Sequence, residues 1–149
     1  MIVLKIEKVK EFMGLLLTGD MFDKFRVSSC EVTTFVTLQT DGKRNDDWYD
    51  SDEREEDASG LVSWQQLKPV VFSLIKGTKT PEKMKIDFCH YMENGDVGSI
   101  RMQFEKGDLM VYTGYMQREF SLDKDRQQAW DENCINFIKK NNIASTQVD

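Results

Sequence analysis

The pattern of apolar and polar positions predicts a helix near the start of the chain. Between residues 7 and 18 the apolar side chains recur at intervals of three and four, at Val9, Phe12, Met13, Leu16 and Leu17. This spacing is typical of an amphipathic helix, and a short alternating strand at residues 2–6 precedes it. Gly19 follows at a position where helices often end.

The second half of the chain predicts a three-strand antiparallel meander. Apolar residues alternate with polar ones from residue 84 to 92 and again from 100 to 104, and a third strand is expected from residue 109 to 120. Asn94-Gly95 and Lys106-Gly107-Asp108 supply the two turns. Strict alternation implies that one face is buried. The expected core is Ile86, Phe88, Ile100, Met102 and Phe104.

Residues 25–49 predict further strands. Phe25 and Val27 indicate one strand, and the alternating β-branched residues from Val32 to Thr40 indicate another. Asp41-Gly42 is a hairpin signal, so we expect a turn there and a weak return strand ending near residue 49.

Two more helices are expected. Ser63 and Gln66 match a capping box. Pro69 lies inside the apolar stripe that follows, which predicts either a kink or a helix that begins at Pro69, and Gly77 should end it. A C-terminal helix should start near Asp123 and end at residues 141–142.

Together these elements predict an α+β fold in one domain spanning residues 1–149. The sheet should be mainly antiparallel, because its strands come in runs joined by tight turns, and about three helices should cover one face of it. Apolar residues make up 40% of the 149 positions and charged residues 31%, which is the balance of a globular protein.

The chain shows no sign of export or membrane insertion. No apolar run approaches the roughly 20 residues that span a bilayer, and no secretory signal precedes the first strand. The cysteines are three, widely spaced and outside any C-x-x-C pair, which favours a reducing cytoplasm over a disulfide framework or a zinc site. We therefore expect a cytoplasmic protein.

The net charge of −6 has one source, an acidic loop or exposed turn at about residues 43–60. Residues 41–57 hold nine acids and three bases, and the rest of the chain is balanced. A basic protein partner is one hypothesis for this segment, and its candidate contacts are Asp50, Asp52, Glu53, Glu55 and Glu56. A solvated, self-repelling loop is the commoner role of such a run. The spacing of a calcium-binding EF-hand is missing, so we predict no metal ligands.

A second candidate is the basic connection at residues 76–85. Lys76, Lys79, Thr80 and Lys83 offer charges and a hydroxyl to an anionic small molecule or a nucleic acid. The connection closes a helix, however, so the helix dipole opposes an anion there, and lysine followed by glycine is ordinary helix C-capping. Nucleic-acid binding is not expected, because the predicted sheet carries few basic residues beside its tyrosines.

His90 is the only histidine, and it falls on the face that carries Ile86 and Phe88. A small enzyme using His90 with an acidic or tyrosine partner is a third hypothesis, but the sequence names no such partner. No catalytic constellation and no cofactor motif is present. The leading interpretation is a non-enzymatic binding domain whose contacts involve the acidic segment.

Several short strings resemble a family of small bacterial proteins of unknown function. They are Phe12-Met13, Gly19-Asp20, Phe22-Asp23, Thr34-Phe35, Asp41-Gly42, the run from Ser73 to Gly77, and Thr80-Pro81. The resemblance spans nearly the whole chain. It implies a free-standing intracellular bacterial protein and carries over no activity and no site.

Overall fold

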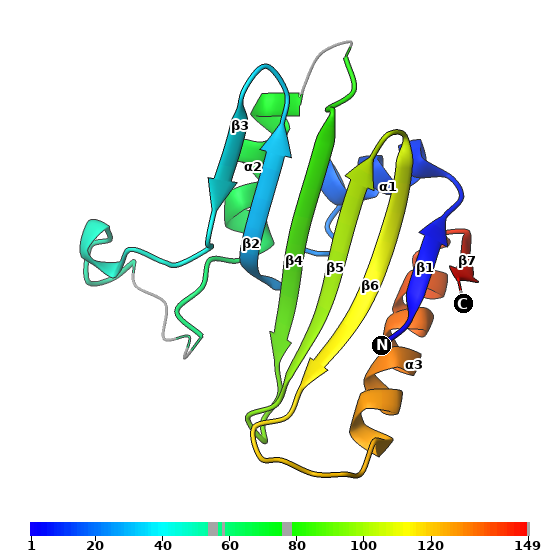
Figure 1. Cartoon of the computed structure of the whole chain (residues 1–149). Coiled ribbons are helices and arrows are strands. Elements are labelled where there is room, and N and C mark those ends of the chain that lie inside the picture. The colour runs from blue at the N-terminus through cyan, green and yellow to red at the C-terminus, as the bar shows by residue number, and fades with distance from the viewer. Residues whose placement is uncertain (54–56, 58, 76–78, 149) are drawn as a thin grey trace.

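The computed structural model describes residues 1–149 except 54–56, 58, 76–78 and 149. The described residues form seven strands, three α-helices and one short 3-10 helix (Figure 1). In chain order these are β1 (Val3–Ile6), α1 (Val9–Leu17), β2 (Arg26–Thr33), β3 (Thr37–Thr40), η1 (Asp46–Trp48), α2 (Trp64–Ile75), β4 (Lys83–Tyr91), β5 (Val97–Glu105), β6 (Asp108–Met116), α3 (Asp125–Lys140) and β7 (Ser145–Val148).

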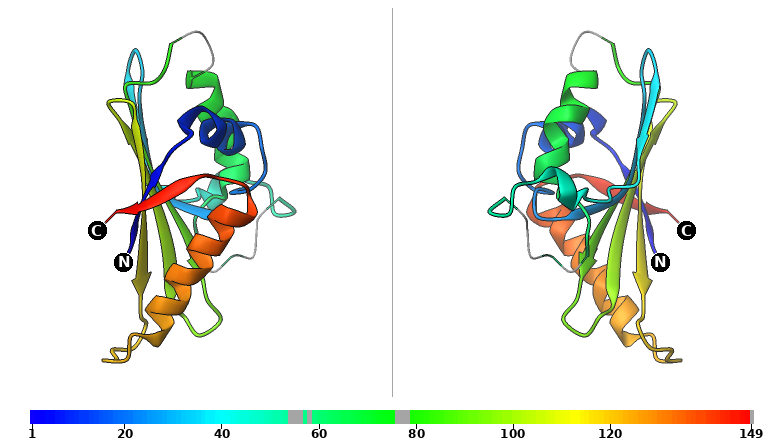
Figure 2. Two further views of the ribbon diagram at one scale, coloured as in Figure 1. Left: turned by 90° about the vertical axis from the view of Figure 1, so that its right-hand side faces the viewer. Right: turned by 90° about the vertical axis from the view of Figure 1, so that its left-hand side faces the viewer.

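All seven strands belong to one antiparallel sheet in the order β3-β2-β4-β5-β6-β1-β7. The three α-helices lie on one side of this sheet (Figure 2). The predicted α+β class, the antiparallel sheet and the single helical layer are therefore confirmed. No helix among the described residues is long and apolar enough to cross a membrane.

The core lies between the sheet and the helices. The five meander residues predicted to be buried together are all at most 4% exposed. Phe22, which follows α1, stacks on Phe88 with ring centroids 4.5 Å apart. The Trp64 indole meets the same Phe88 ring edge-on and donates a hydrogen bond of 2.9 Å to the Leu16 carbonyl. These aromatic contacts join α1 and α2 to β4.

The predicted hairpin at Asp41-Gly42 is wrong. Residues 26–33 form one strand, and the chain turns at residues 34–36 before β3. Gly42 does take the positive φ of 69° that made it a turn signal. A glycine is needed at position 42 for a reason other than a hairpin turn, because a Cβ there would stand 1.8 Å from the Val27 carbonyl oxygen. Residues 43–49, all of them described, form no return strand, and residues 46–48 form η1 instead.

The helices begin close to their predicted positions. The Ser63 hydroxyl accepts from the Gln66 amide at 3.3 Å and the Gln66 side chain accepts from the Ser63 amide at 3.3 Å, so the capping box is confirmed. Helix α2 starts at Trp64 and runs through Pro69, which rules out a start at the proline. The predicted end at Gly77 lies outside the described residues. Helix α3 begins two residues after Asp123, whose carboxylate accepts from the Asp125 amide. Strand β7 was not predicted.

Candidate functional site

The face of the sheet that the helices leave uncovered carries a groove across its central strands. The strand register places Cys89 of β4 beside Ser99 of β5, and Ser99 beside Gly114 of β6. These three small residues form one row at right angles to the strands. Their side chains point away from the helices, because Phe88 and Ile100, their neighbours along the chain, point into the core. The row is the floor of a hollow of about 590 Å³.

Two parallel rows of larger side chains form the walls. Asp87, Arg101 and Tyr112 pair across the strands on one side of the floor, and Tyr91, Val97 and Met116 pair on the other. All six line the hollow. The wall positions are four residues apart along β4, which is about 13 Å at ~3.3 Å per residue. The groove therefore has one polar wall, one apolar wall and a narrow floor.

The polar wall presents little net charge. The Arg101 guanidinium donates from Nε to the Asp87 carboxylate at 2.6 Å and from Nη2 to its other oxygen at 3.3 Å. This two-point pair directs both charges at each other. On the apolar wall, burial raises the pKa of the Tyr91 phenol above its ordinary value, so this group is a neutral hydroxyl at neutral pH. The groove suits an uncharged molecule with hydrogen-bonding groups along one edge and apolar surface along the other.

A buried carboxylate holds the apolar end of the groove in place. Asp96, which is 1% exposed, accepts hydrogen bonds from the Tyr115 hydroxyl at 2.5 Å, the Arg118 amide at 2.9 Å and the Arg126 guanidinium at 2.9 Å. The hydrogen bond from Tyr115, followed by that from the Arg118 amide, lowers the pKa of Asp96 below its ordinary value. Asp96 thus ties the β4–β5 turn to the end of β6 and to α3. The wall residues Val97 and Met116 lie next to these tethers.

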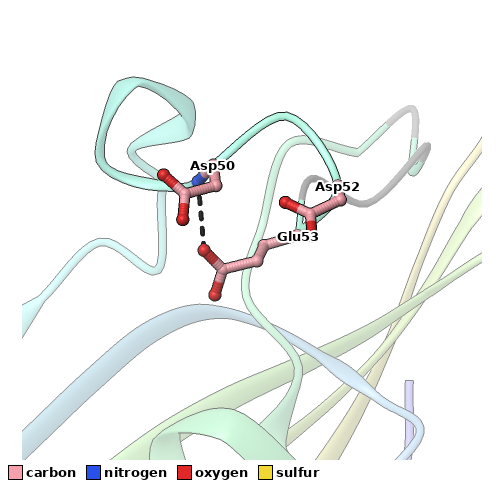
Figure 3. Close-up of side chains that lie close together, drawn as sticks. All are labelled: Asp50, Asp52 and Glu53. Carbon is pink, nitrogen blue, oxygen red and sulfur yellow. Dashed lines mark hydrogen bonds between the residues drawn. The ribbon is translucent and has the colours of Figure 1, made fainter.

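The part of the predicted acidic segment that holds η1 and residues 50–53 extends beyond the C-terminal end of β3 (Figure 1). Asp50, Asp52 and Glu53 gather there with carboxylate oxygens within 4.8 Å of one another, and all three are exposed (Figure 3). The Asp50 amide donates to the Glu53 carboxylate at 3.2 Å, so a local turn accounts for much of the cluster. Exposed acidic groups of this kind are common without a bound ion. Glu55 and Glu56 lie outside the described residues.

One acid of this segment is packed. Asp57 is 27% exposed, its carboxylate pairs with Arg26 of β2 at 3.5 Å, and it accepts a hydrogen bond from the Ser59 hydroxyl. Its backbone carbonyl accepts from Arg44. The sequence pattern groups Asp57 with the exposed acids, whereas the structure uses it to attach the segment to the sheet.

The predicted basic connection is partly described. Lys79 and Thr80 are exposed, and Lys83 is half-buried at the start of β4, where it pairs with Glu105 across the sheet. Lys76 lies outside the described residues. Neither Lys79 nor Lys83 lines the groove, and Lys83 has an acidic neighbour on β5.

His90 lies on the helix side of the sheet, as predicted, at the exposed end of β4. Its ring lies parallel to Trp130 of α3 with centroids 6.2 Å apart and meets Phe25 edge-on at 6.5 Å. Within the described part of the chain, no carboxylate or hydroxyl is hydrogen-bonded to the imidazole. The structure does not bring His90 together with the acidic or tyrosine partner that the enzyme hypothesis needs.

The cysteines are packing residues in this structure. Burial raises the pKa of Cys30 and of Cys134 to about 12, and burial also raises the pKa of Cys89. All three are free thiols. A thiol with a raised pKa stays protonated at neutral pH and is a poor nucleophile. Cys89 instead closes the groove floor and donates its S–H to the Arg26 carbonyl at 3.6 Å.

Sequence reasoning missed the groove, although a signal for it was present. On the three meander strands, small residues occupy positions 89, 99 and 114, which alternate with the positions that face the core. Only the register shows that these positions are neighbours, and the register depends on the length of each turn.

No curated protein and no solved structure matches the chain. One family model does match, over residues 15–97 and 96–145, and these segments contain the groove floor and both of its walls. The match covers most of the chain and agrees with the resemblance found in the short sequence strings. The chain belongs to the family of unknown function DUF5721.

Proposed function

We propose that this protein is a non-enzymatic binding module that holds a small, uncharged amphipathic molecule in the groove of the uncovered sheet face. The observation that carries the proposal is the arrangement of three rows in register. Small residues form the floor, a charge-paired polar wall stands on one side, and an apolar wall stands on the other. An unfilled hollow on an otherwise regular sheet needs small residues on adjacent strands, and this chain has one on each of the three strands β4, β5 and β6.

The chemistry of the groove favours binding over catalysis. A nucleophile or general base needs a group that is activated by a close partner. Burial raises the pKa of the one cysteine in the groove. The Asp87 carboxylate is engaged by Arg101 at two points. The groups that remain are hydroxyls and apolar surface, which position a ligand without transforming it.

Nuclear magnetic resonance titration of ¹⁵N-labelled protein tests the proposal. The probes are 4-propylphenol, which is uncharged and amphipathic, and its charged counterparts benzoate and benzylamine. We expect 4-propylphenol to shift the amide signals of Cys89, Ser99 and Gly114 in a saturable manner. The two charged probes should shift them less, because the Asp87–Arg101 pair offers neither probe a free counter-charge.

A variant that fills the groove supplies the control. Ser99→Leu places a branched side chain over Gly114, whose position leaves room only for the Ser99 hydroxyl. Gln103→Leu makes a similar polar-to-apolar change four residues along β5, on the same face and outside the groove. Ser99→Leu should abolish the shifts and Gln103→Leu should leave them. Equal shifts in both variants, or shifts spread over the whole surface, would rule out the groove.

A second candidate function is favoured by the exposure of one aromatic side chain. Trp48 is 78% exposed and follows Asp46 and Asp47 in η1, just before the cluster of Asp50, Asp52 and Glu53. Tryptophan beside carboxylates suits a basic protein partner, because tryptophan is enriched among residues that dominate interface energies and its ring face attracts cations.

Intrinsic fluorescence tests this second candidate, since Trp64 and Trp130 are buried and Trp48 is exposed to quenchers and partners. Oligolysine should alter the Trp48 emission at low salt. The change should fade as added salt shortens the Debye length below ~10 Å. Asp50→Asn, Asp52→Asn and Glu53→Gln together should remove it, and Lys79→Gln with Lys83→Gln should not. An unchanged response in the acid-neutralised variant would count against the acidic segment.

A further inference from the structure

Strand β3 forms one edge of the sheet, and its outer side is unpaired among the described residues. It pairs with β2, and no other described residue pairs with it. All four of its residues are exposed. An edge strand presents a row of free N–H and C=O groups that can pair with another strand.

The edge also lacks the usual chemical protection against such pairing. Natural proteins guard exposed edges by keeping the edge strand very short, as β3 is, or with charged side chains, prolines or bulges. From Val32 to Thr40 the chain contains no charged residue, no proline and no glycine. Apolar side chains line the same stretch, with Phe35 at 90% exposure, Val36 at 41% and Leu38 at 46%.

We propose that β3 is a homodimerisation edge at which two copies of this chain pair their β3 strands antiparallel about a two-fold axis at Leu38. Leu38 faces the helix side of the sheet, because its partner on β2 is the buried Val32. Directly opposite residues of an antiparallel pair point to the same face. Leu38 then lies against Leu38 of the second copy, and Val36 lies against Thr40 of the second copy.

Charge and symmetry both favour a second copy as the occupant. The acidic segment leaves the C-terminal end of β3, and the hairpin to β2 lies at the other end (Figure 1). Antiparallel pairing therefore places the two acidic segments at opposite ends of the joint, where they do not face each other. The uncharged strand meets its own copy without like-charge repulsion, and a two-fold pairing closes on itself.

The pairing has a definite consequence for the assembly. A two-fold axis that relates antiparallel strands of one sheet stands perpendicular to that sheet. Both helical layers then lie on one side of a continuous sheet, and both uncovered faces lie on the other. Because β3 has only four residues, we expect weak association that depends on protein concentration.

Sedimentation equilibrium over a wide range of protein concentration tests the proposal. The average mass should rise from one chain toward two and no further. Leu38→Lys places two like charges directly opposite each other and should keep the protein monomeric. Its fold should be retained because Leu38 is half-exposed, and the urea midpoint checks this. Mixing Leu38→Lys with Leu38→Glu should restore association, because each dimer then holds an opposite-charge pair.

Val148→Lys is the matched control. Val148 is 41% exposed on β7, at the other edge of the sheet, so the same change there should leave the dimer intact. A single-chain mass at every concentration would overturn the proposal. So would a dimer that survives Leu38→Lys, a mixture that fails to associate, or a mass that grows beyond two chains. The last result would indicate head-to-tail pairing of β3 with β7.

Discussion

The indole ring of Trp130 lies so close to Gly98 that a Cβ atom at position 98 would stand 2.5 Å from the ring atom Cε2. The Trp130 indole also donates a hydrogen bond of 3.1 Å to the carbonyl of Ser99, the next residue along β5. Helix α3 therefore packs onto the sheet through Trp130, and the strand position beneath this ring must be a glycine. The Ser99 side chain points to the opposite face of the sheet, where it lines the groove.

Gly98→Ala should destabilise the protein by about 1–3 kcal/mol, the usual cost of forcing a methyl group into a packed core. The ring cannot move away without breaking its hydrogen bond to Ser99. Urea titration measures the loss. Gly14→Ala is the control, because Gly14 is exposed in α1 and a Cβ there meets nothing within 4 Å. It should stabilise the protein by ~0.5–1 kcal/mol. A neutral Gly98→Ala would show that α3 docks less rigidly than the structure indicates.

Phe88→Ala should cost about 3–5 kcal/mol of unfolding free energy, as for a fully buried aromatic residue. The Phe88 side chain is 0% exposed, and its ring contacts Phe22 and Trp64. Phe120→Ala removes the same atoms from a side chain that is 89% exposed and should change stability by less than ~0.5 kcal/mol. Chemical denaturation of both variants compares the two losses. Similar values would contradict the placement of the core.

The meander could be predicted from the sequence because alternation constrains register as well as secondary structure. The core residues of β4 and β5 all have even numbers, so they lie on one face only if even-numbered positions pair with even-numbered ones. The structure has this register, with Ile86 opposite Met102 and Phe88 opposite Ile100. A turn made of Asn94 and Gly95 alone would pair residue 93 with residue 96, and so would place odd-numbered positions opposite even-numbered ones. The turn instead includes Glu93, and the Met92 amide donates to the Asp96 carbonyl. Burial on one face therefore outweighed the shortest possible turn.

Residues 25–49 could not be predicted in the same way, because their alternation does not report burial. Of the β-branched and apolar run from Val32 to Thr40, only Val32 is buried, and β3 is exposed throughout. A β-bulge between Val27 and Ser29 also shifts the parity of β2. The last strand, β7, is a short polar segment whose pairing with β1 brings together residues more than 130 positions apart. The pattern of residues within a single segment cannot predict a contact between such distant positions.

Asp96 should make the protein sensitive to acid. Its pKa is lowered in the folded state, so it stabilises the fold fully above the pKa of the unfolded chain, near ~3.9. That contribution is lost as the pH falls through the lower folded value. Asp96→Asn should be less stable than the wild type at neutral pH, and the difference should shrink below about pH 4. Thermal unfolding from neutral to strongly acidic pH measures this.

Asp108→Asn is the control for the acid sensitivity. The Asp108 side chain is 66% exposed, and its contact with Lys5 is 3.9 Å long. Its effect should be small at every pH, as expected for an exposed ion pair. If the difference in stability between wild type and Asp96→Asn stayed constant down to strongly acidic pH, Asp96 would stabilise the fold through its packing and not through its negative charge.

The acidic segment should separate into residues that are dispensable for folding and one that is not. Asp50→Asn, Asp52→Asn and Glu53→Gln together should leave the urea midpoint nearly unchanged, since all three side chains are exposed and repel one another. Asp57→Asn should cost about 1–2 kcal/mol, because it weakens the contacts of the half-buried carboxylate with Arg26 and the Ser59 hydroxyl. A large loss in the triple variant would indicate that the cluster holds a structural cation, and an equilibrium titration with calcium and magnesium would then show saturable stabilisation. A neutral Asp57→Asn would mean that Arg26 and Arg44 attach the segment to β2 without this carboxylate.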